Sequence, residues 1–338
     1  MKSVGIVGLP DAGASQIFTA LTAIEEGASG KAHRARVPVP DDRIPVLGTL
    51  HESRKLVYAQ LEFVDTSSMV RRGSRGAGTL PAELLGYLRE SDALLEVVRG
   101  FPLGDPADPA GELEALDLEL TYADMEVVSG TLDRGSKAAR LGDAEAKRQV
   151  AALEKANEIL NRGATLRSES WDDEERAVLR DLSLLTIKPV LIVVNTGEGG
   201  DVAIPEGAIP IAGALEAEVA GMSDEDAAEL LASFGQTERG LDTVIRGIYR
   251  QLDLITFLTA GDTESRAWEV RRGAPAPEAA GAIHSDIQRG FIKAEVVSYD
   301  ALVEAGSWNA AKGKGLVRQE GKTYVMQEGD VVEFRFAV

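Results

Sequence analysis

Four short apolar runs constrain the fold of this chain more than any other feature. They are SVGIVGL (3–9), QLEFVDT (60–66), ALLEVVRGF (93–101) and KPVLIVVNT (188–196). Segments with the residue pattern of helices separate them. Short buried strands that alternate with helices are typical of a parallel sheet with helices on both faces. The sequence therefore predicts an α/β fold with a parallel-rich sheet.

A long helical stretch interrupts this alternation between about residues 111 and 182. It begins with GELEALDLELTYADMEVVSG (111–130) and continues with DAEAKRQVAALEKANEILNR (143–162), which is rich in strong helix formers. We expect these two segments to form an antiparallel helical pair that turns near Gly135 and Gly142.

The pattern changes again after about Leu252. Charged and apolar residues alternate in RAWEVRR (266–272), FIKAEVVS (291–298) and VVEFRFAV (331–338), which indicates strands with one face in solvent. This segment is predicted to form a small β domain. The predicted division is an α/β domain in two parts, a helical insert between them and a final β domain, covering residues 1–110, 183–252, 111–182 and 253–338.

The composition excludes several classes of protein. The chain of 338 residues has no cysteine, which rules out disulfides, cysteine-based zinc sites and thiol catalysis. No apolar run approaches the roughly 20 residues of a membrane-spanning helix, so we expect a cytoplasmic protein without membrane contact. The net charge of −19 disfavours nucleic-acid binding by the chain as a whole. Residues 131–167 are a local exception, with eight Lys or Arg against five Asp or Glu.

Residues 8–16, GLPDAGASQ, lie between the first predicted strand and a predicted helix. A phosphate-binding loop has this position and the pattern G-x-x-x-x-G-K-[ST]. Gly8, Gly13 and Ser15 match the pattern, but Ala14 occupies the lysine position. One interpretation is a nucleotide site, in which backbone N–H groups and the helix N-terminus attract phosphate. The other is a tight turn in which Asp11 caps the helix. The candidate nucleotide-binding residues are Gly8, Leu9, Pro10, Asp11, Ala12, Gly13, Ala14, Ser15 and Gln16.

Longer segments resemble one known family, the YchF branch of the Obg-related GTPases, also called Obg-like ATPases. The C-terminal run from Thr259 to Ser298, with the ending QEGDVVEFRF, resembles the TGS domain, a β-grasp module. The resemblance implies a P-loop NTPase (G-domain) fold, an inserted helical coiled coil and a C-terminal TGS domain. It also implies a preference for ATP over GTP and an association with ribosomes. The other segments that carry it are GIVGLPDAG (5–13), EFVDTSSMV (62–70), LRESDALLEVVR (88–99), LSLLTIKPVLIVVN (182–195) and ALEAEVAGM (214–222).

The resemblance assigns further residues to a site. Asp65 ends a predicted strand at the position of the family aspartate that holds Mg²⁺, and Ser15 supplies a second metal-binding oxygen. Asn195 and Glu198 match the family's base-recognition motif, in which Asn195 meets the adenine edge and Glu198 disfavours guanine. A solvated turn is the alternative at these two positions. The implied cofactors are ATP or GTP, with Mg²⁺ when nucleotide is bound.

The chain departs from the family pattern where the chemistry takes place. Ala14 replaces the lysine that meets the β- and γ-phosphates, and Asp11 puts a carboxylate where relatives have asparagine. Ser68 stands at the position of the switch glycine. Residues 23–48 contain no threonine for Mg²⁺, and residues 101–111 contain no histidine to position water. We therefore expect a nucleotide-binding protein with weak or absent hydrolysis and no catalytic residue. An active ATPase or GTPase switch is the alternative.

The three histidines of the chain, His33, His51 and His284, form no recognisable metal or catalytic motif. We expect His284 to be a capping or packing residue.

The resemblance implies the ribosome or ribosomal RNA as the partner, contacted through the helical insert and the TGS domain. The insert offers its local excess of positive charge. The TGS domain offers a small basic patch, formed by Lys312, Lys314, Arg318 and Lys322.

Overall fold

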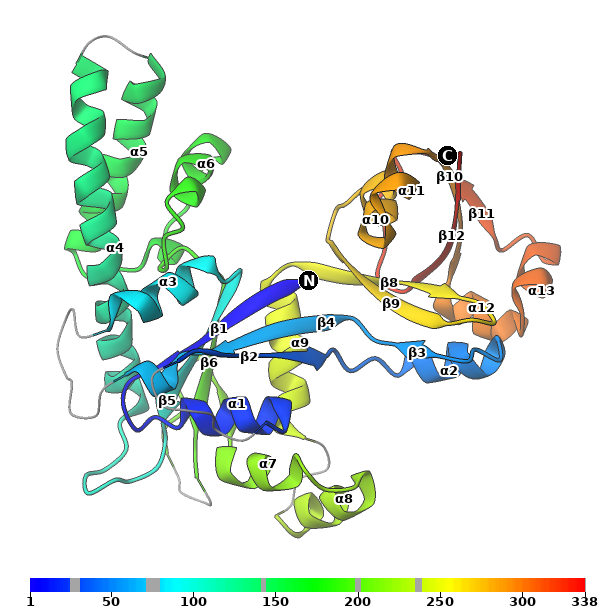
Figure 1. The fold of residues 1–338 in the computed structure, drawn as a ribbon, viewed down its shortest axis with the longest axis horizontal. Helices are drawn as coiled ribbons and strands as arrows, with labels where there is room; N and C mark the ends of the chain where they lie inside the picture. Colours follow the sequence, from blue (N-terminus) through cyan, green and yellow to red (C-terminus); the bar gives the residue numbers. More distant parts are fainter. Residues whose placement is uncertain (25–30, 71–79, 141–143, 198–201, 235–238, 338) are drawn as a thin grey trace. The chain divides into compact units, whose positions relative to one another are not determined.

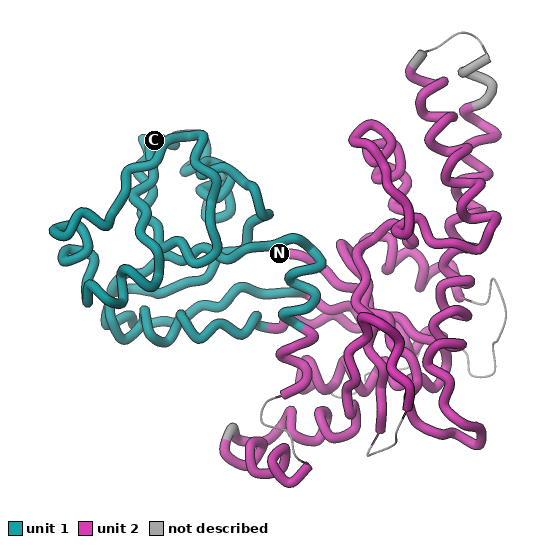
Figure 2. The backbone as a smooth tube through the Cα atoms, turned by 180° about the vertical axis from the view of Figure 1, so that it is seen from behind, with its two compact units in different colours: residues 1, 38–61, 245–338 teal, residues 2–37, 62–244 magenta. Residues whose placement is uncertain are grey.

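The structure, a computed structural model, describes residues 1–24, 31–70, 80–140, 144–197, 202–234 and 239–337. The chain forms two compact units (Figure 2). We name them the N-terminal unit, Lys2–Val37 with Glu62–Val244, and the C-terminal unit, Met1 with Pro38–Leu61 and Ile245–Val338. Within the described residues, no helix is both long enough and apolar enough to cross a membrane.

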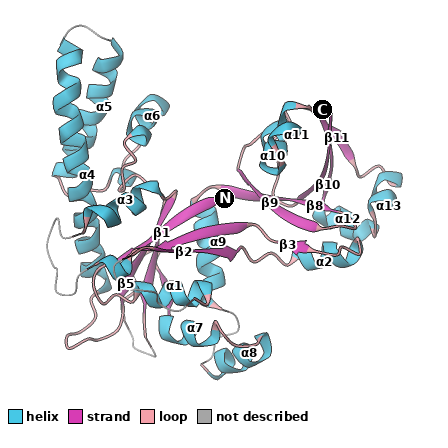
Figure 3. Ribbon diagram, viewed as in Figure 1, coloured by secondary structure: helices cyan, strands magenta, loops and turns pink. Residues whose placement is uncertain are grey.

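A six-stranded sheet forms the centre of the N-terminal unit (Figures 1 and 3). Its strands are β1 (Lys2–Gly8), β2 (His33–Pro38), β4 (Gln60–Asp65), β5 (Ala93–Arg99), β6 (Val190–Asn195) and β7 (Ile209–Ile211). They lie in the order β2-β4-β1-β5-β6-β7, and the pairs β1–β5, β5–β6 and β6–β7 are parallel. β5 is buried along its whole length, as expected of a strand covered on both faces. The predicted α/β fold with a parallel-rich sheet is confirmed.

Five helices accompany these strands in the chain. They are α1 (Ala14–Thr22), α3 (Ala82–Glu90), α7 (Gly213–Val219), α8 (Asp224–Ser233) and α9 (Gly240–Gln251). On α3, Leu84 and Leu88 are fully buried and pack with Leu94 of β5 in one hydrophobic cluster. Burial of this apolar face, with polar residues left outside, holds the helix on the sheet.

The helical insert is a long antiparallel pair. α4 (Pro109–Arg140) and α5 (Ala144–Asn161) pack side by side (Figure 1). A short helix, α6 (Asp173–Asp181), follows and begins with a capping box between Asp172 and Glu175. The sequence predicted a turn near Gly135 and Gly142, but α4 continues through Gly135, and Gly142 lies outside the described residues.

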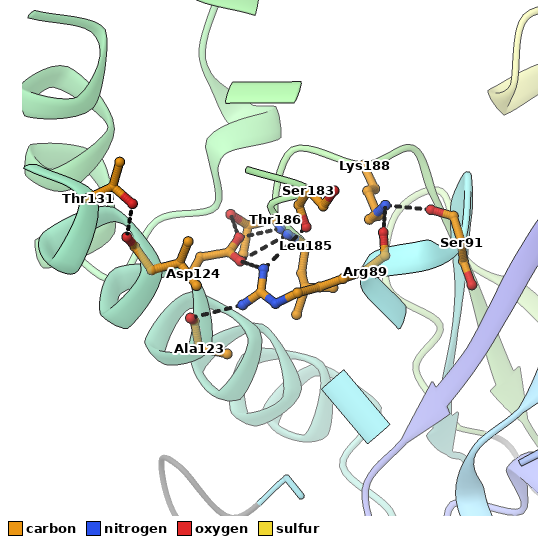
Figure 4. Close-up of polar contacts among 10 residues, drawn as sticks. Arg89, Ser91, Ala123, Asp124, Thr131, Ser183, Leu185, Thr186 and Lys188 are labelled. Carbon is orange, nitrogen blue, oxygen red and sulfur yellow. Dashed lines mark hydrogen bonds and ion pairs between the residues drawn. The ribbon is translucent and has the colours of Figure 1, made fainter. Parts of the chain in front are cut away.

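A buried carboxylate of the insert joins α4 to α3 and to the segment that precedes β6 (Figure 4). Asp124 of α4 is 0% exposed. It accepts hydrogen bonds from the backbone N–H of Leu185 (2.9 Å) and of Thr186 (2.7 Å), and from the Thr186 hydroxyl (2.8 Å). Nη1 of Arg89, on α3, lies 3.0 Å from the same carboxylate. A buried charge is tolerated only when it is paired and hydrogen-bonded, and Asp124 meets both conditions.

A second buried charge cluster lies between α4 and β5 and is less well satisfied. Arg167, in the short 3₁₀ helix η2 (Leu166–Ser168), donates to Glu96 of β5 (3.3 Å) and to Asp117 of α4. Among the described residues, Oε2 of Glu96 has no hydrogen-bond partner. Burial raises the pKa of Glu96 to about 7, against the opposing effect of Arg167. Glu96 therefore titrates near neutral pH inside the sheet.

The C-terminal unit contains a second six-stranded sheet, in the order β11-β10-β12-β8-β9-β3. The strands are β3 (Leu56–Val57), β8 (Leu254–Ala260), β9 (Ser265–Arg271), β10 (Phe291–Ser298), β11 (Arg318–Glu320) and β12 (Asp330–Phe336). The helices are α2 (Arg43–Leu50), α10 (Ala276–Ile283), α11 (Ser285–Arg289), α12 (Tyr299–Ala305) and α13 (Trp308–Gly313). Nδ1 of His284 accepts a hydrogen bond from the N–H of Asp286 (3.1 Å) at the start of α11, so the predicted capping role is confirmed.

Residues 38–61 belong to the C-terminal unit, although the sequence placed them in the first α/β segment. Ile44 and Leu47 of α2 are 0% exposed, and β3 pairs in parallel with β9. The Ser53 hydroxyl donates to the carbonyl of Gly261 (2.6 Å). β3 has only two residues, so the sequence pattern of a strand is too short there to predict the pairing with β9. The predicted boundaries of the four segments otherwise stay a prediction. The division into two compact units does not test them, because the helical insert and the α/β sheet lie in the same unit.

Two glycines shape the turn between β1 and α1. Gly13 has φ +83°, and a Cβ there would lie 2.1 Å from Nδ2 of Asn195. A Cβ on Gly8 would lie 2.6 Å from the carbonyl oxygen of Val97. Both positions therefore exclude a side chain, one by backbone conformation and contact, the other by contact alone. Gly13 is the N-cap of α1, which has no side-chain cap.

We expect Glu96→Gln to stabilise the protein in alkaline solution. The pKa of Glu96 is raised to about 7 in the folded chain from about 4.3 in an unfolded one. The folded state therefore binds this proton more tightly, so the wild type loses stability as the pH rises between these values. The variant avoids up to about 3 kcal/mol of this loss. Urea unfolding at about pH 5 and about pH 8 measures the difference.

The matched control for that experiment is Glu83→Gln, which changes an exposed carboxylate of α3. It should leave the pH dependence of unfolding as it is in the wild type. Equal stability of wild type and Glu96→Gln at about pH 8 would show that Arg167 fully offsets the burial of Glu96.

We expect Gly13→Ala to destabilise the N-terminal unit by more than about 2 kcal/mol, because it combines a left-handed backbone with a clash against Asn195. Gly86→Ala is the control. Gly86 is an exposed residue in the middle of α3, and a Cβ added there would meet no described neighbour within 4 Å. Alanine at this position should therefore stabilise the helix by about 0.5–1 kcal/mol. The midpoints of urea unfolding decide both. A neutral Gly13→Ala would mean that the turn relaxes easily.

Candidate functional site

A cavity of about 600 Å³ opens beside the carboxyl ends of β1 and β4. This is the edge of a parallel sheet at which α/β proteins bind ligands. Eight of the nine loop residues predicted from the sequence line it, and the ninth, Ala12, is buried. The lining residues are Gly8, Leu9, Pro10, Asp11, Gly13, Ala14, Ser15, Gln16, Phe18, His33, Asp65, Ser67, Ser68, Val70, Phe101 and Leu103.

The two predicted metal-binding residues are linked at the floor of this cavity. Asp65 is 3% exposed and accepts hydrogen bonds from the N–H (2.9 Å) and the hydroxyl (2.6 Å) of Ser67. The hydroxyls of Ser67 and Ser15 are hydrogen-bonded to each other. One carboxylate and two hydroxyls thus meet, and oxygen ligands of this kind suit Mg²⁺.

A cation at this position would need further ligands. The described residues contain no group of three or more His, Asp or Glu side chains that could hold a metal ion. Mg²⁺ is commonly bound by one or two protein groups together with phosphates and waters. Ser15 and Asp65 therefore fit a metal that arrives with a phosphate ligand, and do not form a metal site of their own.

The segment after β4 is held in place by its serines. It forms the 3₁₀ helix η1 (Ser67–Met69), in which the Ser68 hydroxyl donates to the carbonyl of Lys31 (2.9 Å). Ser68 stands where the family pattern has the switch glycine, and its side chain makes a contact that glycine cannot make. Met69 is buried in the hydrophobic cluster beside α3.

The buried side chain of Asn195 is hydrogen-bonded to the loop between β1 and α1. It is 1% exposed. Its Nδ2 donates to the carbonyl of Ala12 and to Oε1 of Gln16 (3.2 Å each), and its Oδ1 accepts from the N–H of Gly213 (3.1 Å). Both ends of the amide are engaged, so a contact from Asn195 to a nucleotide base stays a prediction. Glu198 lies outside the described residues.

A buried arginine holds the wall of the cavity that follows β5. Nε of Arg99 and its backbone N–H each donate to the carboxylate of Glu112 (2.9 Å), and Nη1 donates to the carbonyl of Phe101 (2.9 Å). These bonds fix the start of the loop that carries Phe101 and Leu103 to the cavity. The resemblance implied a histidine in this loop, and the two described loop residues that line the cavity, Phe101 and Leu103, are apolar.

The charge of the cavity is unusual for a phosphate site. Among the described residues that line it, Asp11 and Asp65 are acidic and none is Lys or Arg. His33, at the start of β2, is the one lining side chain that can become positive. Attraction for an anion therefore rests on the backbone N–H groups of the loop and the N-terminus of α1.

Seven lining residues were not among the predicted site residues: Phe18, His33, Ser67, Ser68, Val70, Phe101 and Leu103. Ser67 follows Asp65 by two positions, a spacing that could have signalled a shared site. His33 and Phe101 come from segments far apart in the sequence, and only the fold brings them to the loop.

Comparisons with known proteins agree along the whole chain. A family model named YchF-GTPase_C, described as a protein of unknown function (DUF933), matches residues 254–337. Two curated proteins called "Ribosome-binding ATPase YchF" are each 37% identical to this chain, one from Haemophilus influenzae and one from Bacillus subtilis. Each alignment covers 99% of this chain and 99% of the relative.

A solved structure is similar as well. The YchF GTPase of Schizosaccharomyces pombe superposes with a TM-score of 0.86 at 28% identity, covering 99% of this chain and 97% of that one. The predicted combination of a P-loop NTPase fold, a helical insert and a C-terminal domain is therefore confirmed at the level of fold. With relatives above 30% identity over nearly the full length, the chain belongs to the YchF family.

Proposed function

We propose that this chain binds a purine nucleoside phosphate, ATP or GTP, in the cavity beside β1 and hydrolyses it slowly or not at all. The observation that carries the proposal is the cavity itself, which is lined by the glycine-bounded loop and floored by the linked Ser15, Ser67 and Asp65. The names of the relatives, which are called ribosome-binding ATPases, support nucleotide as the ligand.

The residues present can bind and orient phosphate. The loop N–H groups and the N-terminus of α1 attract it, and Ser15 with Asp65 would hold Mg²⁺ if the ion accompanies the nucleotide. That ion would neutralise phosphate charge.

The cytoplasmic location of the protein stays a prediction.

The proposal of slow hydrolysis rests on what the described lining of this cavity lacks. Phosphoryl transfer depends on positioning and on neutralising developing charge. Ala14 offers no cation, Ser68 replaces a glycine, and Phe101 and Leu103 form the wall where the family pattern has a histidine. Loss of one preorganised stabiliser typically lowers the rate by ~10²–10³.

An active nucleotide switch is the second candidate. Its support is the hydrogen-bonded chain in which the hydroxyl of Ser67 links Ser15 to Asp65 in the cavity.

We expect Ala14→Lys combined with Asp11→Asn to increase nucleotide affinity by roughly one to two decades. Ala14 lines the cavity, so a longer side chain can reach a bound phosphate, and a charge-assisted hydrogen bond contributes about 1.5–3 kcal/mol. Isothermal titration of wild type and variant with ATP, ADP and GTP measures the gain, and phosphate release measures turnover.

Wild-type turnover should lie near the uncatalysed background. No gain in affinity by the double variant would mean that the cavity does not accept phosphate in this way. Wild-type turnover like that of the relatives would instead favour the active switch.

We further propose that the ribosome or its RNA is a partner, through the helical insert and the C-terminal unit, as the names of the relatives suggest. A Lys or Arg that already forms an ion pair within the protein has less charge to offer to RNA phosphates. In the insert, Lys155 pairs with Glu175 (2.9 Å), and Arg162 lies 3.7 Å from Glu169. Acidic residues after α5 thus offset part of the predicted positive excess. In the C-terminal unit, Lys312 lies 3.3 Å from Glu295.

Exposed cations near the tip of the insert therefore provide the sharper test. We expect Arg134→Glu with Lys147→Glu to weaken co-sedimentation with ribosomes about tenfold at low salt, because two phosphate contacts are lost and replaced by repulsion. The control is Arg36→Glu with Arg250→Glu, which makes the same change in net charge on β2 and α9, at exposed positions. Equal loss in both double variants would indicate an effect of net charge, and no loss in either would exclude the insert as the contact.

A further inference from the structure

The cavity needs a positive group that the loop does not supply. Its described lining includes Asp11 and Asp65 but no Lys or Arg, and the proposed ligand carries several negative charges. Backbone N–H groups attract an anion but bring no net charge. A second source of hydrogen bonds and charge within reach of the loop would resolve this imbalance.

His33 has the required position. It is the first residue of β2 and lines the cavity together with Ser15 and Ala14. Side chains alternate along a strand, and Ala35 and Val37, which share the face of His33, are buried. The same alternation turns Arg34 to the other face, where it pairs with Glu62 and Glu90 (3.2 Å each). His33 thus faces inward at the end of its strand.

The imidazole of His33 also has unused hydrogen-bonding capacity. Its Nε2 is hidden from solvent and has no hydrogen-bond partner among the described residues. A ring nitrogen in this state costs free energy until it finds a partner. A phosphate oxygen in the adjacent cavity would be such a partner, reached by rotation of the side chain.

We propose that His33 is a phosphate-binding residue of this cavity and takes over, in part, the role of the absent loop lysine. This inference rests on the proposed nucleotide site. The neutral ring donates one hydrogen bond, and the protonated ring adds a positive charge. The other titratable groups of the described lining are the carboxyl groups of Asp11 and Asp65.

The experiment is isothermal titration of Mg²⁺ with ADP and with ATP, at about pH 6 and about pH 8, which bracket the usual titration of imidazole. Wild type is compared with His33→Ala, His33→Gln and His33→Lys. His51→Gln is the matched control, since Nε2 of His51 is also hidden and has no partner in the described part of the chain, but His51 does not line the cavity. The affinity ratio of variant to wild type at each pH cancels the titration of the nucleotide and of both aspartates.

We expect His33→Ala to weaken binding about tenfold or more near pH 6 and by less near pH 8, because charged hydrogen bonds contribute more than neutral ones. His33→Lys should restore binding at both pH values, and His51→Gln should bind like wild type. Thermal unfolding of each variant identifies loss of structure. If the alanine variant unfolds, the inference is tested with His33→Gln, which preserves the volume of the side chain. The ratio of its nucleotide affinity to that of the wild type is compared at the same two pH values.

Equal affinity of wild type and His33→Ala near pH 6 would overturn the inference and leave the proposed function standing. A loss of the same size near pH 6 and near pH 8, unrestored by lysine, would also overturn it, because it would mark a structural role. The absence of nucleotide binding by wild type at both pH values would overturn the proposed function and this inference with it.

Discussion

The buried amide of Asn195 holds together the part of the molecule on which the candidate site depends. Its three hydrogen bonds join the loop after β1, the first turn of α1 and the start of α7. The carbonyl of Ala12 and the N–H of Gly213 would otherwise be left unsatisfied inside the protein, at a cost of about 1–3 kcal/mol each. The same amide nitrogen leaves no room for a Cβ on Gly13. The loop therefore takes its shape from Asn195 of β6 and from Gly13, and this shape does not depend on the residue at position 14.

Two buried carboxylates of the N-terminal unit, Asp124 and Asp65, have different hydrogen-bond partners. Beneath the insert, Asp124 is surrounded by donors and by Arg89, so nothing is left for a ligand. In the cavity, Asp65 is bound by the hydroxyl and N–H of one serine and has no cation beside it in the described lining. A fully satisfied network gives rigidity, whereas a carboxylate held only by neutral donors still favours a positive partner. The second arrangement is the one that suits a binding site.

Much of the architecture was predictable because local rules and tertiary structure agree. Strands and helices alternate as the apolar runs indicated, and the loop of Gly8 and Gly13 lies where the motif placed it. Contacts between distant segments were not predictable. Asn195 matched a base-recognition motif, but its amide is engaged by the loop, a fact that depends on the β6 register. The positive excess of the insert looked exposed because its acidic partners, such as Glu175, come later in the chain. His33 reaches the cavity only through the order of strands, which places β2 in the same sheet as β1 and β4.

The C-terminal unit is built from two pieces of chain separated by nearly the whole N-terminal unit. Ile44 and Leu47 belong to its interior, and Arg43 lies 2.7 Å from Glu328, near the end of the sequence. Contacts so distant in sequence form slowly, because a long loop must close before they are made. During synthesis, residues 38–61 emerge early, and Ile44 and Leu47 stay uncovered until β9 and α12, which contact α2, have left the ribosome. The α/β sheet has all its strands before that moment, so its interior can be covered while that of the C-terminal unit is still open.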